Sequence, residues 1–117
     1  NINIKNTNIT LTPAISDYIS KRLEAVKKLF EKDPTAKCNV ELARTTNHHK
    51  NGDVFRAEIH ITAKEKDLYA SAEEQDLYRA IDVMRDEILR EARSMKAKKI
   101  SLIKRGGARI KNIIKGM

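Results

Sequence analysis

A long run of apolar residues at helical spacing constrains the fold of this chain more than any other feature. Between Ser71 and Lys99 the apolar side chains recur every three or four residues, at Leu77, Ile81, Met84, Ile88, Ala92 and Met95. That spacing places them on one face of an α-helix. The helix begins either at Ser71, which forms an S-x-x-E capping box with Glu74, or at Asp76, whose side chain can cap the following turn. The sequence therefore predicts one long amphipathic helix.

The charge of the chain is concentrated at the end of this helix and after it. The chain has 24 Lys and Arg and 16 Asp and Glu, but eight of the basic residues and none of the acidic ones follow Arg93. The first 93 residues are therefore neutral, and the net charge of +8 lies in the last 24 residues. A helical projection groups Arg79, Arg90 and Arg93 opposite the apolar stripe.

Alternation of apolar and polar residues predicts four strands, at residues 1–6, 37–45, 55–63 and 68–70. A helix is expected from Pro13 to about Glu31, because Thr12 can cap it, proline is favoured at the first helical position, and Asp33-Pro34 ends it. The order β-α-β-β-β-α indicates an α+β fold, a four-stranded mixed sheet with two helices packed on one face. The first two strands would be parallel if they are adjacent, and the other pairs antiparallel.

The motifs that enzymes and metal sites require are not found. Cys38 is the single cysteine and is interpreted as a small core residue. His48, His49 and His60 lack the spacing to carboxylates or cysteines that a metal site needs. No apolar run approaches the roughly 20 residues of a membrane span. We expect a cytoplasmic protein that is not an enzyme and needs no metal or cofactor.

A basic stripe that continues into a tail without acids is typical of a protein that binds a polyanion. Aromatic residues make up 4% of the chain, which favours phosphate contacts to structured RNA over base stacking. A general structured-RNA-binding module is one alternative, and a merely solubilising tail is another. A third is a peripheral membrane or partner-binding protein, because a basic amphipathic helix could align Ile110, Ile113, Ile114 and Met117.

Two motifs resemble those of a known family. Ala70-Ser71-Ala72 is followed by Asp76-Leu77-Tyr78-Arg79-Ala80-Ile81-Asp82, and the opening Asn3-Ile4 leads through Ile9-Thr10 to Thr12-Pro13-Ala14-Ile15. Over about residues 1–99 the chain closely resembles the ribosome hibernation promoting factor and ribosome-associated inhibitor family, in its short form without a C-terminal dimerisation domain. The resemblance implies binding to the small ribosomal subunit in the mRNA and tRNA channel. It also implies inhibition of translation by occupancy, in stationary phase or stress.

The resemblance implies a ribosome-binding α+β domain at residues 1–99, followed by a basic tail at 100–117. The expected partner is the small subunit and its rRNA, with no membrane or small-molecule substrate, and the protein is expected to be a monomer off the ribosome. The expected RNA-binding residues are Arg22, Lys28, Arg79, Arg85, Arg90, Arg93, Lys96, Lys98, Lys99, Lys104, Arg105, Arg109 and Lys111.

Some of these positions leave alternatives open. Arg22, Lys28 and Arg90 fall where members of the family tend to be basic. Basic residues of the family are replaced by Ala25, Glu87 and Ser94 in this chain. Arg22 also lies within an apolar stripe and Arg85 near the margin of the other, so either could extend past the core with only its charged end in water.

Overall fold

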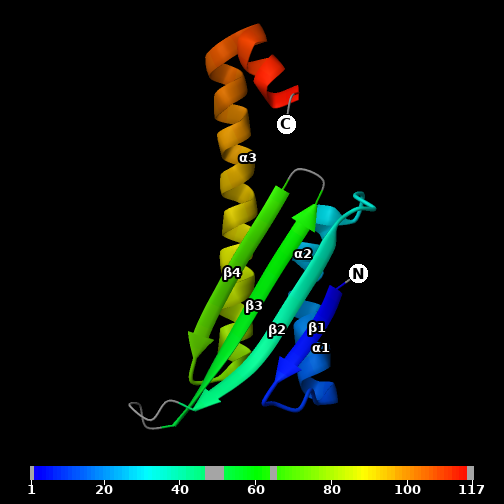
Figure 1. Cartoon of the computed structure of the whole chain (residues 1–117), viewed down its shortest axis with the longest axis vertical. Coiled ribbons are helices and arrows are strands. Elements are labelled where there is room, and N and C mark those ends of the chain that lie inside the picture. The colour runs from blue at the N-terminus through cyan, green and yellow to red at the C-terminus, as the bar shows by residue number, and fades with distance from the viewer. Residues whose placement is uncertain (1, 47–51, 64–65, 116–117) are drawn as a thin grey trace.

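Four strands form one sheet, and three helices lie on one of its faces (Figure 1). The computed structural model describes residues 2–46, 52–63 and 66–115, with side chains described for 2–45, 52–63 and 67–96. The elements are β1 (Ile2–Thr7), α1 (Pro13–Arg22), α2 (Glu24–Phe30), β2 (Lys37–Thr46), β3 (Asp53–Ala63), β4 (Lys66–Glu74) and α3 (Leu77–Lys115). This order confirms the predicted α+β fold.

The strands are arranged in the order β1-β2-β3-β4. β1 and β2 run parallel, with Ile4 opposite Val40, and α1 and α2 make the crossover between them. The β2–β3 and β3–β4 pairs are antiparallel. The mixed sheet is therefore confirmed, including the parallel first pair.

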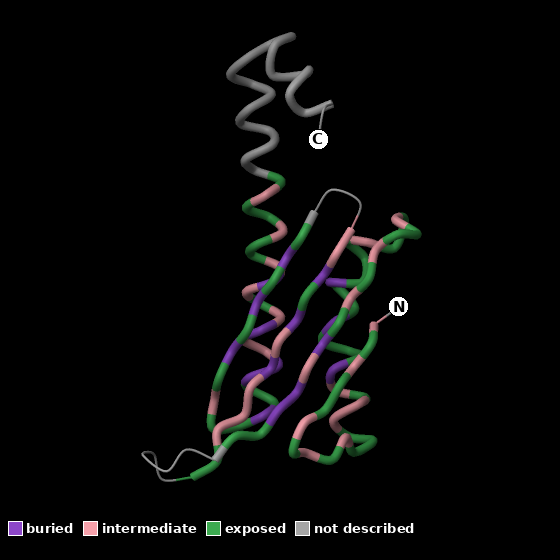
Figure 2. Tube along the Cα trace, in the orientation of Figure 1, coloured by how far each residue is buried: buried purple, intermediate pink, exposed green. Residues whose placement is uncertain are grey.

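The core lies between the helices and the covered face of the sheet. Buried positions alternate with more exposed ones along β3 and β4, as Figure 2 shows in purple, so one face of each strand contributes to the core. The strands provide Val40, Leu42, Ala57, Ile59, Ile61, Leu68, Ala70 and Ala72, and the helices provide Ile19, Leu23, Val26, Leu77, Ala80, Ile81, Met84 and Ile88. Burial of these side chains holds α3 and α1–α2 on the sheet.

The first helical region is interrupted at one residue, where a single helix was expected. The predicted cap is present, since the backbone N–H of Ile15 donates to Thr12 Oγ1 at 3.2 Å. Leu23, at φ −92° and ψ 4°, separates α1 from α2. Its N–H still donates to the carbonyl of Ile19, and its side chain is fully buried. Apolar residues of α1 and α2 therefore face the core on both sides of the interruption.

The long helix begins at the second of the two positions that the sequence offered, and it ends later than expected. The prediction of a capping box at Ser71 is wrong, because Ser71 and Glu74 lie in β4 and pair with β3. Asp76 is the cap, since Tyr78 N–H donates to its Oδ1 at 3.1 Å. The helical backbone does not end near Lys99 but continues to Lys115, beyond the sheet, and changes direction in its last part (Figure 1).

Candidate nucleic-acid interface

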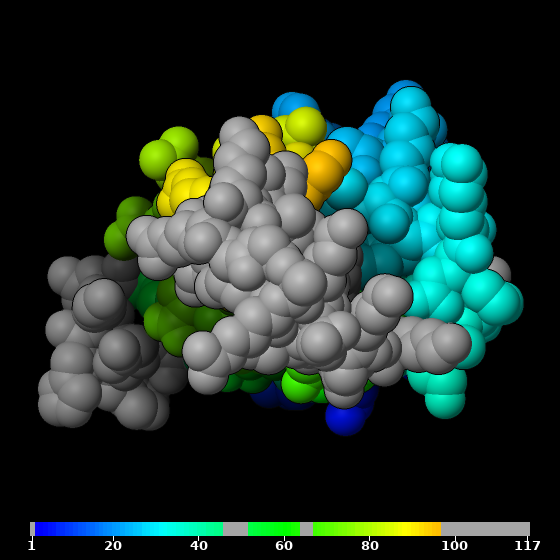
Figure 3. Space-filling model, turned by 90° about the horizontal axis from the view of Figure 1, so that it is seen from above, coloured from blue at the N-terminus to red at the C-terminus, as the bar shows by residue number. Residues whose placement is uncertain are grey.

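The outward surface of the helices carries most of the residues expected to contact RNA whose side chains the structure describes. Seen from above, α3 (yellow and orange) lies beside α1 and α2 (blue) on the same side of the molecule (Figure 3). The two helical segments are thus neighbours in one layer, with a seam between them. Side chains from both segments meet across this seam.

One end of the seam is closed by a cluster of polar and aromatic side chains. The hydroxyl of Tyr18 in α1 donates to Asp82 of α3, at 2.7 Å from Oδ1 and 2.9 Å from Oδ2. Arg22 Nε lies 3.0 Å from Asp82 Oδ1, and its guanidinium carbon lies 5.1 Å from the centroid of the Tyr18 ring. Tyr78 meets that ring edge-on, with centroids 4.8 Å apart. We call Tyr18, Arg22, Tyr78 and Asp82 the seam cluster.

Protonation in the seam cluster follows from these contacts. The hydrogen bond to Asp82 raises the pKa of Tyr18, because ionisation of the hydroxyl would remove the donated proton. The hydrogen bond with Tyr18 and the charge of Asp82 raise the pKa of Arg22. Tyr18 therefore remains a donor and Arg22 a cation at any pH at which the protein works.

Besides Arg22, two other expected RNA-binding arginines form ion pairs within the protein. Arg79 Nε lies 3.0 Å from Glu74 Oε1, and an Arg85 Nη atom lies 3.0 Å from Asp86 Oδ1. The side chain of Arg85 is 29% exposed, and its buried Nε has no hydrogen-bond partner among the described residues. Arg85 therefore lies against the core with only its end in water. Arg79 remains accessible, since exposed pairs of this kind contribute less than about 1 kcal/mol.

Four other expected residues are exposed and form no ion pair within the described part of the chain: Lys28, Arg90, Arg93 and Lys96. We call these four residues the open cation group. On α3 a step of three residues turns the side chain by about 60°, so Arg90, Arg93 and Lys96 sweep across the helix surface. Of these three residues, Arg90 lies beside β4, where it lines a shallow hollow of about 260 Å³ with Tyr69 and Glu87. The group presents unneutralised charge to solvent.

The remaining six expected residues belong to the later part of α3. The side chains of Lys98, Lys99, Lys104, Arg105, Arg109 and Lys111 lie outside the described side chains, so their RNA contacts stay a prediction. His48 and His49 also lie outside the described residues. Sequence reasoning named Arg22 but missed its partners in the seam cluster. In the sequence, Asp82 was named as the last residue of the motif that begins at Asp76.

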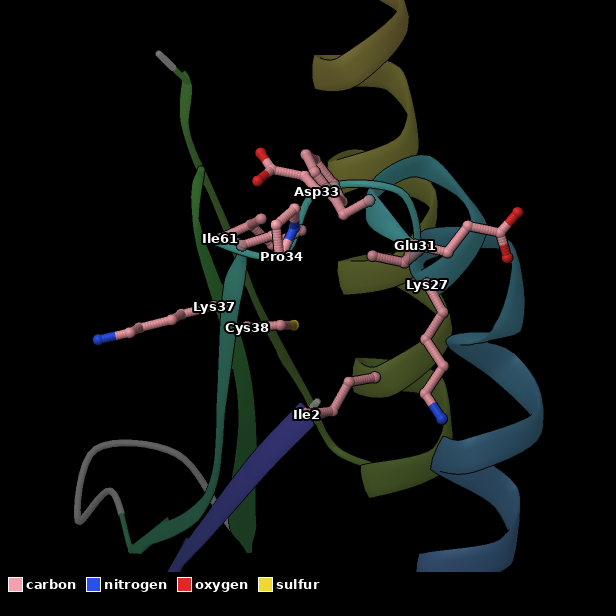
Figure 4. Close-up of a pocket in the computed structure, with 11 residues that line it drawn as sticks. Ile2, Lys27, Glu31, Asp33, Pro34, Lys37, Cys38 and Ile61 are labelled. Atoms are coloured by element: carbon pink, nitrogen blue, oxygen red, sulfur yellow. The ribbon is translucent and has the colours of Figure 1, made fainter. Parts of the chain in front are cut away.

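A cavity of about 410 Å³ opens between the end of α2 and the start of β2 (Figure 4). Cys38 points into it from the sheet, and Lys37 points away from it. Burial raises the pKa of the Cys38 thiol to about 11, so the residue remains a neutral thiol. The part of the chain that the structure describes holds no cluster of metal-ligating side chains. It also has no helix long and apolar enough to cross a membrane.

Comparison with known proteins places this chain in a family. The chain matches 33% of residues over 95 positions in a ribosome hibernation promotion factor of Picosynechococcus, covering 81% of this chain and 48% of that protein. A protein of the same name from Bacillus subtilis is 28% identical over 98 residues, covering 84% and 49%. The chain thus spans about half the length of these two curated relatives.

A solved structure shows a similar arrangement. The N-terminal domain of Protein Y from Thermus thermophilus matches with a TM-score of 0.65 and 25% identity, covering 81% of this chain and 98% of that one. A ribosomal subunit interface protein from Coxiella burnetii, 14% identical with a TM-score of 0.67, shows the same fold. The model of the Sigma 54 modulation protein / S30EA ribosomal protein family matches residues 2–100. This match confirms the resemblance noted in the sequence, and the chain belongs to the Sigma 54 modulation protein / S30EA ribosomal protein family.

Proposed function

We propose that this protein is a ribosome hibernation factor that binds the small ribosomal subunit in the mRNA and tRNA channel. It inhibits translation in idle or stressed cells by occupying that channel, without catalysing a reaction. We call the outward surface of α1, α2 and α3 the helix layer. The observation that carries this proposal is the open cation group on the helix layer of a chain that belongs to the S30EA family. The names of the curated relatives support the hibernation role.

The geometry supports binding to structured RNA through phosphates. The residues of the open cation group project from α2 and α3, which both pack on the same sheet, so their backbone positions have defined spacings from which the charged side chains can reach the phosphates of a folded rRNA. The side chains that face the core are apolar, which leaves the outward surface of the helices for a partner. The basic tail at residues 100–117, of which 100–115 belong to α3, extends this surface in the proposal.

Binding to separated ribosomal subunits tests the proposal directly. The purified protein should cosediment with bacterial small subunits, and mRNA with initiator tRNA should displace it, because all three occupy one channel. Addition to a translation extract should reduce protein synthesis. Large subunits and a free RNA duplex of similar length are the controls.

Two results would contradict this function. Binding to the free duplex as tightly as to small subunits would indicate a general structured-RNA-binding module. Full simultaneous binding of the protein, mRNA and initiator tRNA would exclude occupancy of the channel. Location can be checked in stationary-phase cells, where the protein should be cytoplasmic and found in the ribosomal fractions of a sucrose gradient.

A further inference from the structure

Arg22 differs from the other basic residues of the helix layer because it is held from two helices. Its partner Asp82 is 60 residues away in the chain and belongs to α3. The Tyr18 hydroxyl binds the same carboxylate, and the Tyr18 ring lies under the guanidinium. Two contacts therefore restrict the guanidinium directly, and a third holds the carboxylate with which it pairs, whereas the described surroundings of Arg93 include no ion pair.

Arg22 keeps the capacity to bind a second anion. A guanidinium has five N–H donors, and even a two-point contact with Asp82 uses two of them. Its side chain is 43% exposed, and no carboxylate other than Asp82 pairs with it among the described residues. Planar guanidinium groups bind phosphate oxygens in pairs, which a lysine cannot do. A restricted guanidinium also loses less conformational freedom on binding.

We propose that Asp82 and Tyr18 are positioning residues that hold Arg22 across the seam, with its remaining donors directed outward to bind one phosphate of the RNA backbone. This inference rests on the proposed function, since it specifies how the helix layer takes up one phosphate. Arg22 is the residue that touches the phosphate. Asp82 and Tyr18 act through it.

Whether removal of the Asp82 charge weakens or strengthens RNA binding distinguishes a positioning role from a purely electrostatic one. Asp82 carries a negative charge on a surface that binds a polyanion, so charge alone predicts that its removal strengthens RNA binding. Positioning predicts the reverse, because Arg22 without Asp82 loses its fixed orientation. Asp86 provides a matched control, since it is an acid on the same helix that pairs with Arg85 at the same distance of 3.0 Å.

The test measures affinity for purified small subunits at one ionic strength. Asp82→Asn should weaken binding about threefold or more, and Asp86→Asn should leave it unchanged or strengthen it. Tyr18→Phe removes only the hydroxyl and changes no charge, so any loss it causes reports positioning. Arg22→Met should cost roughly tenfold, the order expected for one charge-assisted contact, and Arg22→Lys nearly as much.

A double-mutant cycle shows whether Asp82 acts through Arg22. In an Arg22→Met background, Asp82→Asn should cause no further loss, since there is no guanidinium left to position. Melting temperatures of all variants are measured alongside. A loss from Asp82→Asn of equal size in both backgrounds, or tighter binding in the wild-type background, would overturn the inference.

Anchoring of Arg22 can also be measured without the ribosome. In the free protein, the Nε–H of Arg22 should exchange with water more slowly than that of Arg93, and Asp82→Asn should abolish the difference. Equal exchange at the two residues would refute the anchoring itself. Failure of the wild-type protein to bind small subunits would instead refute the proposed function, so the two failures are distinguishable.

Discussion

Reversal of two charges on α3 should reduce both the affinity for the small subunit and its dependence on salt. Arg90 and Arg93 are exposed and unpaired among the described residues, so each is free to neutralise a phosphate. One phosphate contact contributes about 0.7 to 0.9 to the slope of log affinity against log salt. The double variant Arg90→Glu and Arg93→Glu should therefore flatten the slope by roughly 1.4 to 1.8. Between 50 and 200 mM salt the wild-type protein should lose roughly 7- to 12-fold more affinity than the variant.

The opposite side of the molecule offers a control with the same change in net charge. Lys5 and Lys37 are exposed residues of the sheet, and Lys37 points away from the helices (Figure 4). Lys5→Glu with Lys37→Glu should leave the slope unchanged if the helix layer is the contact surface. Binding is measured by sedimentation with small subunits at several salt concentrations. Equal flattening by both double variants would show that only net charge matters, and no flattening by either would remove Arg90 and Arg93 from the interface. All four positions are exposed, and the ion pair of Lys5 with Glu41, at 3.9 Å, involves a lysine side chain that is 75% exposed, so melting temperatures should change little.

Three further outcomes follow from the fold and the charge distribution. Asp76→Ala should cost about 1 kcal/mol of stability through loss of the α3 cap, whereas Ser71→Ala, in an exposed strand position, should cost less than about 0.5 kcal/mol by thermal unfolding. Cys38, with its pKa raised from 9.0 to about 11, is about 100-fold less ionised at pH 8 than an ordinary thiol, so alkylation followed by mass spectrometry should be slow until the protein is unfolded or the pH approaches 11. Deletion of residues 100–117 removes five basic residues and should flatten the salt slope by roughly 3.5 to 4.5 while the melting temperature stays the same; an unchanged slope would show that the tail only aids solubility.

Local patterns in the sequence were sufficient to predict the fold. Alternation along residues 55–63 predicted a strand with one buried face, and β3 has that pattern. The Thr12 cap was also correct. The break at Leu23 could not be predicted, because no glycine or proline marks it and the buried side chain keeps its helical phase. The false cap at Ser71 arose because S-x-x-E also occurs by chance on a strand whose backbone groups are already paired.

The candidate interface was predictable in part. Exposure of Arg90 and Arg93 followed from the projection of one helix, which needs only local spacing. The pairing of Arg22 with Asp82 depends on how α1 packs against α3, and spacing within either helix carries no information about that contact. Arg85 lay at the margin of the apolar stripe, and its low exposure agrees with the snorkelling alternative.

The length of α3 gives this molecule a permanent electric dipole. The helix has 39 residues, a path of roughly 58 Å, whereas β3, with 11 residues, spans about 36 Å. Residues 1–93 are neutral, so the whole excess of charge is carried by the end of the helix that extends beyond the sheet. Near a polyanion, such a charge distribution experiences a torque as well as an attraction, and the molecule rotates before contact. If the protein binds RNA as proposed, the end of α3 arrives first and the helix layer second, so the position of the charge selects the orientation in which the domain approaches its proposed RNA partner.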